Sequence, residues 1–320
     1  MTVSVIIPTY NSPYLREALD SVFAQSLLPS EIILVDSSPD STLSTLKDYR
    51  DRVVYFYQPP QGVSAARNFG LQKAQGKYLA LLDADDVWLA DKLQKQVGLL
   101  ERNQGIGFSF STVWNLINGE QGKIPSEPFF PPALQRWIVK GIQHEGAVSG
   151  LAYDLLLDVN CIATSSLVIR RDAIDKTGLF DESLNNGEDY DFELRLAREF
   201  PALFITEPTS RYRVHEAGLS GIWTARSELF YQANLKVLEK HQQLYPSPVV
   251  KRAIACAYDD YALHRLKVGD PEMAASYAWR SLRTRPSLTA FKCYAEAVWP
   301  NAYSFLSVRR GITRHDGSKG

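Results

Sequence analysis

The first hundred residues alternate short apolar runs with segments of helical periodicity, and this alternation most constrains the fold. The runs are rich in β-branched residues and lie at 3–7, 31–35, 53–57 and 78–82. Near-continuous apolar runs of this length suit strands that are buried on both faces. Helical spacing over about 12–23 and 64–74 supplies crossover connections that parallel strands need. The order predicts an α/β fold with a mostly parallel central sheet.

Local signals refine this prediction. Ser12 is placed to cap the first helix, with Pro13 at its first helical position, and Asp91 is placed to cap a helix that continues to about residue 100. A strand is expected around 108–110. From about 115 to 160 the periodicity is lost and prolines gather, so we expect a long irregular insert that is either a binding loop or a lid. Later periodicity predicts a strand at 164–169 and a helix at 190–199.

The character of the chain changes at residue 224. Helical spacing recurs in four segments, near 225–243, 249–268, 271–284 and 287–298, and residues 314–320 have the composition of a loose tail. Alanines at the inward positions permit close helix approach, although the segments are too uneven for a true repeat. We therefore expect two domains, an α/β domain over 1–223 and an all-α region over 224–320.

Composition excludes several classes of protein. With 35 basic and 36 acidic residues the net charge is −1, which removes the electrostatic attraction that nucleic-acid binders carry. The three cysteines are far apart and lack a CxxC pair, so neither a disulfide framework nor a thiolate metal site is supported. The N-terminus lacks the pattern of a signal peptide, and no apolar stretch is long enough to span a bilayer. We expect a cytoplasmic protein.

The end of the chain leaves one alternative open. Aromatic and aliphatic residues from Trp299 to Leu306 are followed by Arg309, Arg310 and Arg314. An apolar segment followed by basic residues is typical of a peripheral contact with a membrane surface, here the inner face of the membrane. Burial of the same residues against the α/β domain is the competing interpretation.

Polar side chains follow three of the predicted strands. Tyr10 follows the first strand, Asp36 the second, and Asp83, Asp85 and Asp86 the fourth. Ligands bind at the carboxyl ends of the strands in open parallel sheets, so these residues converge on one edge. Crowded carboxylates repel one another, and Mg²⁺ or Mn²⁺ with oxygen ligands relieves the repulsion. Each aspartate alone is equally suited to capping a helix or ending a turn.

Common catalytic motifs are missing from the sequence. There is no GxGxxG, GxxxxGK[ST], HExxH or GxSxG. Dinucleotide-dependent redox chemistry, P-loop phosphate transfer, zinc proteolysis and serine hydrolysis therefore lose support.

Six short segments together resemble family 2 glycosyltransferases with the GT-A fold. They follow one another in the family's order over about residues 1–221: VSVIIPTYN, LVDSSPD, GVSAARNFGL, GKYLALLDADD, GEDYDFELRL and YRVHEAGLS. Each segment alone is a weak signal, whereas six in order are specific. The resemblance implies a GT-A domain that binds a nucleotide diphosphate sugar.

The resemblance assigns the nucleotide base to the first two segments. Tyr10 matches a ring that stacks on the base, within the segment Pro8, Thr9, Tyr10 and Asn11. Asp36 matches a carboxylate that hydrogen-bonds the base, typically uracil. Relatives often read VDDGS where this chain reads VDSSP, so the second carboxylate of the motif is replaced here by a serine. A half-buried aromatic residue without a ligand is the alternative for Tyr10.

The resemblance assigns the diphosphate and the metal to two later segments. Asp83, Ala84 and Asp85 match the DxD motif, whose first aspartate lies near the ribose and whose second binds the metal, Mn²⁺ or Mg²⁺. His215 matches a histidine that reaches the metal or the diphosphate, and Arg213 matches a residue near the phosphates. A structural role is the alternative for the histidine.

The resemblance assigns catalysis to the fifth segment. Asp189 matches the general base of the ED motif beside Glu188, and Arg67 matches a basic residue near the nucleotide. Acidic residues also complement the dipole at a helix start, and a base held there is well oriented. One base with in-line attack inverts the anomeric centre, and the metal offsets charge on the leaving diphosphate.

These assignments predict a metal-dependent, inverting glycosyltransferase. The donor is a nucleotide diphosphate sugar, with UDP favoured, and the acceptor is a hydroxyl of a glycan or of a lipid-linked molecule in polysaccharide synthesis. Two alternatives stay open: a nucleotidyltransferase acting on sugar phosphates, and a non-catalytic helical interaction protein with a degenerate transferase domain. The first lacks its Gly-rich basic phosphate loop here, and the second requires loss of the DxD or ED carboxylates, which are intact.

Overall fold

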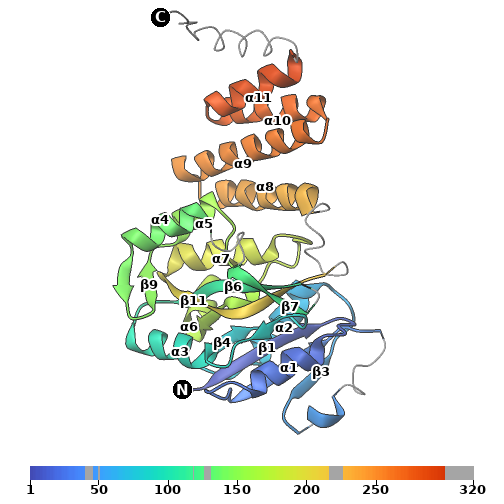
Figure 1. Cartoon of the computed structure of the whole chain (residues 1–320), viewed down its shortest axis with the longest axis vertical. Helices are drawn as coiled ribbons and strands as arrows, with labels where there is room; N and C mark the ends of the chain where they lie inside the picture. Colours follow the sequence, from blue (N-terminus) through green and yellow to red (C-terminus); the bar gives the residue numbers. More distant parts are fainter. Residues whose placement is uncertain (40–45, 50, 118, 126–130, 216–225, 300–320) are drawn as a thin grey trace, which may run out of the picture. The chain divides into compact units, whose positions relative to one another are not determined.

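The computed structural model describes residues 1–39, 46–49, 51–117, 119–125, 131–215 and 226–299. The chain forms two compact units, Met1–Arg226 and Ser227–Gly320. The first unit contains a central sheet with helices packed against it, and the second is built from helices (Figure 1).

Within the described residues the first unit has an eleven-stranded sheet, in the order β3-β2-β1-β4-β10-β6-β11-β9-β8, with β5 paired to β11 and β7 to β6. The strands are β1 (Val3–Thr9), β2 (Glu31–Asp36), β3 (Val54–Tyr57), β4 (Tyr78–Leu81), β5 (Val87–Trp88), β6 (Phe108–Ile117), β7 (Glu120–Pro125), β8 (Ile142–His144), β9 (Ala147–Gly150), β10 (Val168–Arg170) and β11 (Ala202–Val214). Strands β3, β2, β1 and β4 are parallel, as their apolar runs predict. Beyond β4 the sheet is mixed, because β10 runs antiparallel to both of its neighbours.

Helices cover both faces of the parallel strands. The helices of the first unit within the described residues are α1 (Leu15–Phe23), α2 (Val63–Lys73), α3 (Lys92–Arg102), α4 (Pro132–Lys140), α5 (Tyr153–Asp158), α6 (Arg171–Thr177) and α7 (Glu188–Glu199), with 3₁₀ turns η2 (Lys47–Tyr49) and η4 (Thr164–Ser166). Alternate side chains of β1 share a core cluster with α1 and α3. On the other face α2 approaches closely, since a Cβ at Gly70 would lie 2.4 Å from Ile6 Cγ2.

Two local predictions, one of a helix cap and one of a strand, need correction. Helix α1 begins at Leu15 with Tyr14 as its N-cap residue, and Ser12 does not cap it. The Ser12 hydroxyl instead donates to the carbonyl of Ala84 at 2.9 Å, which ties the loop after β1 to the loop after β4. The predicted strand at 164–169 begins later, since 164–166 forms the turn η4.

The prediction that 115–160 forms an irregular insert is also wrong, because much of this segment forms helices and strands. It contains the end of β6, then β7, α4, β8, β9 and α5. The hairpin β8–β9 turns at Gly146, whose φ of 73° suits glycine, and β9 pairs with β11. Strands of three or four residues are too short to display a period of two, which is why the sequence pattern is blurred there.

The second unit contains helices α8 (Arg226–Leu244), α9 (Pro248–Lys267), α10 (Pro271–Thr284) and α11 (Leu288–Val298). Each of the last three begins with a side-chain cap, given by Ser247, Asp270 and Ser287. Ala262, Ala278 and Cys293 are buried where α9, α10 and α11 approach one another. Among the helices of the described residues, none has both the length and the hydrophobicity needed to cross a bilayer. The predicted apolar and basic segment near the end of the chain lies, from residue 300 onward, outside the described residues.

Candidate active site

The segment after β1 presents one exposed ring above buried backbone. Tyr10 is 60% exposed, whereas Thr9 before it is buried. Asn11 adopts a φ of 49°, a left-handed conformation that Asn tolerates better than most residues. Its N–H donates to the hydroxyl of Ser38 at 2.8 Å, which joins this turn to the loop after β2. Most of the Tyr10 side chain is therefore open to solvent at the carboxyl end of β1.

Asp36 ends β2 and is fully buried. One carboxylate oxygen accepts the N–H of Ser38 at 2.9 Å, and the other accepts the hydroxyl of Tyr55 at 3.0 Å. The Ser37 N–H donates to the carbonyl of Thr9 at 2.9 Å. Asp36 therefore fixes the loop that also anchors the Tyr10 turn, a role that the sequence alone does not indicate.

Arg67 joins the predicted DxD and ED motifs. The side chain projects from α2, is 4% exposed, and donates to Asp83 Oδ1 at 2.8 Å and to Glu188 Oε1 at 3.0 Å. Asp83 follows β4, and Glu188 begins α7. The structure thus brings together three of the predicted residues that are far apart in the sequence.

Burial and charge change the acidity of this cluster. Burial, and after it the neighbouring Asp189, raise the pKa of Glu188 to about 7 against the opposing effect of Arg67. Burial likewise raises the pKa of Asp189 above its ordinary value, again opposed by Arg67. Burial alone would lower the pKa of Arg67, but Asp83 and Glu188 more than compensate, so it stays charged. The cluster thus holds a permanent cation among carboxylates whose proton affinity is increased.

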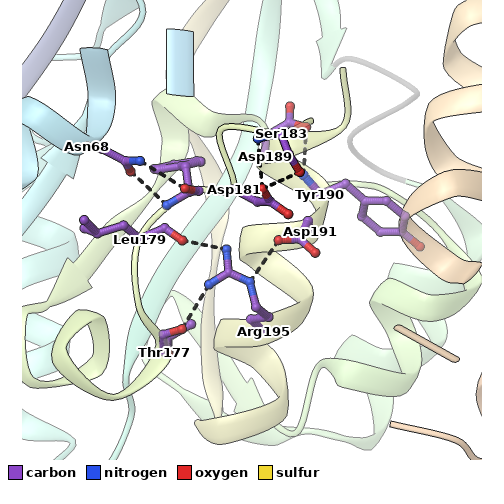
Figure 2. A network of polar contacts seen from close by, with 10 residues as sticks. Asn68, Thr177, Leu179, Asp181, Ser183, Asp189, Tyr190, Asp191 and Arg195 are labelled. Atoms are coloured by element: carbon purple, nitrogen blue, oxygen red, sulfur yellow. Dashed lines mark hydrogen bonds and ion pairs between the residues drawn. The ribbon is translucent and has the colours of Figure 1, made fainter. Parts of the chain in front are cut away.

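The start of α7 is held in place from two sides. Gly187, with a φ of 78°, turns the chain into the helix, and Asp189 accepts the N–H of Tyr190 at 2.7 Å. Figure 2 shows the Asn68 side chain, next to Arg67 on α2, reaching the loop before α7, where its amide bonds both the N–H and the carbonyl of Phe180. These contacts fix the position of Asp189 relative to α2.

A second clamp acts on the same loop from within α7. Arg195 pairs with Asp191 at 2.9 Å and donates to the carbonyls of Thr177 and Leu179 (Figure 2). The first residues of the loop before the predicted base are therefore bonded by side chains of both α2 and α7.

A second cluster forms where β11 passes the loop after β4. His215 Nε2 lies 3.0 Å from Asp85 Oδ2, and Arg213 Nε donates to the Asp85 carbonyl at 2.7 Å. The Arg213 guanidinium also donates to Glu17 Oε2 at 2.6 Å and lies 4.0 Å from the centre of the Tyr14 ring. Burial raises the pKa of Asp85, Asp83 raises it further, and the hydrogen bond from His215 opposes them. Glu17 and Tyr14 carry no motif signal and were not predicted.

No cluster of three or more His, Cys, Asp and Glu side chains suited to a metal ion occurs in the part of the chain that the structure describes. Asp85 and His215 form the pair that carries metal-type donors here, a carboxylate oxygen and an imidazole nitrogen. Asp86, the next residue, is 2% exposed and takes part in hydrogen bonds that face the protein interior.

The chain matches known glycosyltransferases in sequence. The model of glycosyl transferase family 2 matches residues 4–174. An uncharacterized glycosyltransferase of Rickettsia typhi is 30% identical over 249 residues, which cover 76% of this chain and 74% of that protein. A putative teichuronic acid biosynthesis glycosyltransferase, TuaG of Bacillus subtilis, is 42% identical over 115 residues, covering 33% of this chain and 45% of that protein.

Solved structures match over most of the chain. TarS 1-349 of S. aureus in complex with UDP-GlcNAc has a TM-score of 0.67 at 16% identity, covering 98% of this chain and 93% of that one. The mannosyltransferase PcManGT of Pyrobaculum calidifontis, in complex with GDP-Man and Mn²⁺, has a TM-score of 0.56 at 20% identity, covering 96% and 83%. These likenesses show the fold, which is the GT-A fold. The chain therefore belongs to glycosyltransferase family 2 and is a glycosyltransferase.

Proposed function

We propose that this glycosyltransferase is inverting and depends on a divalent metal, and that it moves a sugar from a UDP-sugar to a hydroxyl of a glycan or lipid-linked acceptor. The observation that carries the proposal is the buried Arg67, which bonds one carboxylate of DxD and one of ED at the same time. Donor and base motifs separated by about a hundred residues would have no reason to share one buried cation in a domain that had lost activity.

The donor would bind at the carboxyl ends of β1, β2 and β4. The exposed ring of Tyr10 suits stacking on a base, and Thr9 and Asn11 hold the turn that presents it. Asp83 and Ala84 lie at the start of the next loop, and Arg213 supplies a guanidinium near Asp85. TarS with UDP-GlcNAc and PcManGT with GDP-Man differ in the base bound. The preference for UDP therefore rests on the family resemblance of the segment around Asp36, whose buried carboxylate shapes the loop beside Tyr10 through Ser38 and Tyr55.

The donor set at Asp85 and His215 fits Mn²⁺ or Mg²⁺. Burial and the neighbouring Asp83 raise the pKa of Asp85, which means that an added cation would stabilise the ionised carboxylate. Such ions accept one or two protein ligands and take their remaining ligands from water and phosphate oxygens. When bound, the metal would offset the charge that develops on the leaving diphosphate. The Mn²⁺ bound in PcManGT is in keeping with this assignment.

Asp189 would take the proton from the acceptor hydroxyl. It is partly exposed at the first turn of α7, and one of its oxygens is oriented by the Tyr190 N–H. Burial raises its pKa above the ordinary value, which makes it a stronger base than an exposed aspartate, and the charge of Arg67 limits this rise. A single base with in-line attack inverts the anomeric centre, so no second carboxylate is needed as a nucleophile.

A donor screen tests the proposal. Thermal shifts are measured with UDP, GDP and dTDP, each with Mn²⁺ and with EDTA, followed by release of sugar from the matching nucleotide sugar. We expect UDP with Mn²⁺ to give the largest shift and UDP-sugar to be cleaved to UDP. Production of a nucleotide sugar from a sugar phosphate would favour the nucleotidyltransferase alternative, and no shift with any nucleotide would favour the non-catalytic one.

A further inference from the structure

The turn η4 lies directly beside the loop that carries the two DxD aspartates. It precedes β10, whose residue Val168 pairs with Ala80 of β4. Two side chains of α3 hold the turn, since Lys92 Nζ and Gln96 Nε2 both donate to the Ser166 carbonyl at 2.9 Å. Side chains of α3 therefore fix the position of this turn next to the end of β4.

Ser165 bonds two residues of that loop and one residue of β5, the strand that follows it. Its hydroxyl accepts the N–H of Asp83 at 3.1 Å and donates to Asp86 Oδ2 at 2.5 Å. Its carbonyl accepts the indole N–H of Trp88 at 2.8 Å. Ser165 is 1% exposed, so water cannot replace these contacts without rearrangement.

Asp86 carries the contact across to the opposite side of the loop. While Oδ2 takes the Ser165 hydroxyl, Oδ1 accepts the N–H of Arg213 on β11 at 2.8 Å. Arg213 in turn bonds the carbonyl of Asp85. The loop that presents Asp83 and Asp85 is thus fastened on one side to η4 and on the other to β11.

We infer that Ser165 is a positioning residue whose hydroxyl sets the place of Asp83 and, through Asp86, of Asp85 for donor binding. The inference rests on the proposed donor role of the DxD motif. Replacement by alanine removes the acceptor of the Asp83 N–H and leaves a buried carboxylate oxygen without its donor. Both changes release the loop, and displacement of a binding group by about 1 Å is enough to reduce catalysis ~100-fold.

The neighbouring Ser166 offers a matched control. It is equally buried, lies in the same turn, and its hydroxyl has no hydrogen-bond partner in the described residues. Ser165→Ala and Ser166→Ala therefore remove the same atom from adjacent positions, one bonded and one not. Any general effect of losing a buried hydroxyl in this turn appears in both variants.

The experiment measures UDP binding with Mn²⁺ by calorimetry, together with thermal unfolding and the kcat and KM for UDP-sugar. We expect Ser165→Ala to bind UDP about tenfold more weakly than wild type, corresponding to loss of a hydrogen bond to a charged group, with Ser166→Ala within about twofold. Ser165→Cys, which keeps a weak donor of similar size, should fall between them. Asp86→Asn removes the charge from the group that accepts the Ser165 hydroxyl and so weakens the same contact from its other end, and its effect should not add fully to that of Ser165→Ala.

Failure of the inference and failure of the proposed function give different results. If wild type binds UDP equally with Mn²⁺ and EDTA, the proposed function is wrong. If wild type shows metal-dependent binding but Ser165→Ala binds UDP as Ser166→Ala does, even with a lower melting temperature, Ser165 has a structural role alone and the inference is overturned. If Ser165→Ala does not fold, additive effects of Ser165→Cys and Asp86→Asn on UDP affinity overturn it.

Discussion

Replacing Arg67 with methionine should destabilise the first unit by an amount that depends on pH. The guanidinium is 4% exposed and bonds Asp83 and Glu188. Methionine keeps much of the side-chain volume but leaves the Glu188 carboxylate, with 10% of its side chain exposed, without its cation. Removing one partner of a buried ion pair commonly costs about 3–5 kcal/mol of unfolding free energy. We expect a loss in this range at about pH 8, where Glu188 of wild type is ionised and its pair with Arg67 is fully formed.

Acid should recover part of that loss. Glu188 has a folded pKa of about 7, raised from 4.5, so its contribution to stability is present below 4.5 and is lost as the pH rises through 7. Arg67 lowers this pKa, and its removal moves the value higher, so that the variant stays protonated where wild type has begun to ionise. Between about pH 8 and 6 the native variant binds on average about half a proton more than native wild type, which reduces the loss by ~1 kcal/mol at the lower pH.

Urea unfolding followed by tryptophan fluorescence measures both quantities in the full chain. Arg67→Lys is the matched charge control. It should lose less unfolding free energy than Arg67→Met, because the lysine ammonium keeps the positive charge and can still pair with one of the two carboxylates. The double variant Arg67→Met with Glu188→Gln should lose the part of the pH dependence that comes from Glu188. The part that remains comes from Asp189 and Glu193, whose pKa values Arg67 also lowers. A loss that is the same at both pH values, or a pH-dependent part that is undiminished in the double variant, would refute the reasoning.

Three further predictions concern the proposed roles. Asp189→Asn should lower kcat by ~10²- to 10⁴-fold with UDP affinity near wild type; an equal fall in affinity, measured by calorimetry, would make Asp189 a binding or structural residue. Asp85→Ala should weaken UDP binding in Mn²⁺ and change it little in EDTA, and a matching loss in EDTA would contradict a metal ligand. Because the Tyr10 ring is 60% exposed, Tyr10→Ala should leave the melting temperature unchanged while lowering UDP affinity about tenfold, and Tyr10→Phe should retain it; equal affinity in all three proteins would remove the stacking role.

The sequence predicts the parallel half of the sheet and the helices well, because their patterns are local. Runs such as 31–35 are apolar on both faces, and the observed β2, Glu31–Asp36, extends the run by one residue. The helices predicted near 225–243 and 271–284 are found at Arg226–Leu244 and Pro271–Thr284. Each of these patterns lies within a single helix or strand, so no distant contact is needed to interpret it.

The long strand β11 was not predicted. Its residues Ala202–Val214 include Glu207, Pro208 and Arg211, and its register shifts between Ile205 and Ser210. A shift of this kind interrupts the alternation of side chains, so the period of two is lost across the strand. The strand forms because β6 and β9 lie on either side of it, which is tertiary information.

The site shows the same division between local and distant information. The DxD and ED carboxylates and Arg67 are visible in the sequence motifs, but that Arg67 bonds a carboxylate of both motifs is known only from the fold. Ser165 contacts residues about 80 positions earlier, and a single serine in a short turn gives no signal in the sequence. Motifs therefore indicate which groups take part in chemistry, whereas the residues that hold them require the structure.

The most direct test of the central claim is the anomeric configuration of the sugar released from an α-linked UDP-sugar in the presence of Mn²⁺. Proton NMR recorded before mutarotation, with water or an added hydroxyl acceptor, distinguishes the two anomers. The account predicts a β product, and the same experiment with Asp189→Asn should give almost none. An α product formed by wild type would contradict attack assisted by a single base at Asp189.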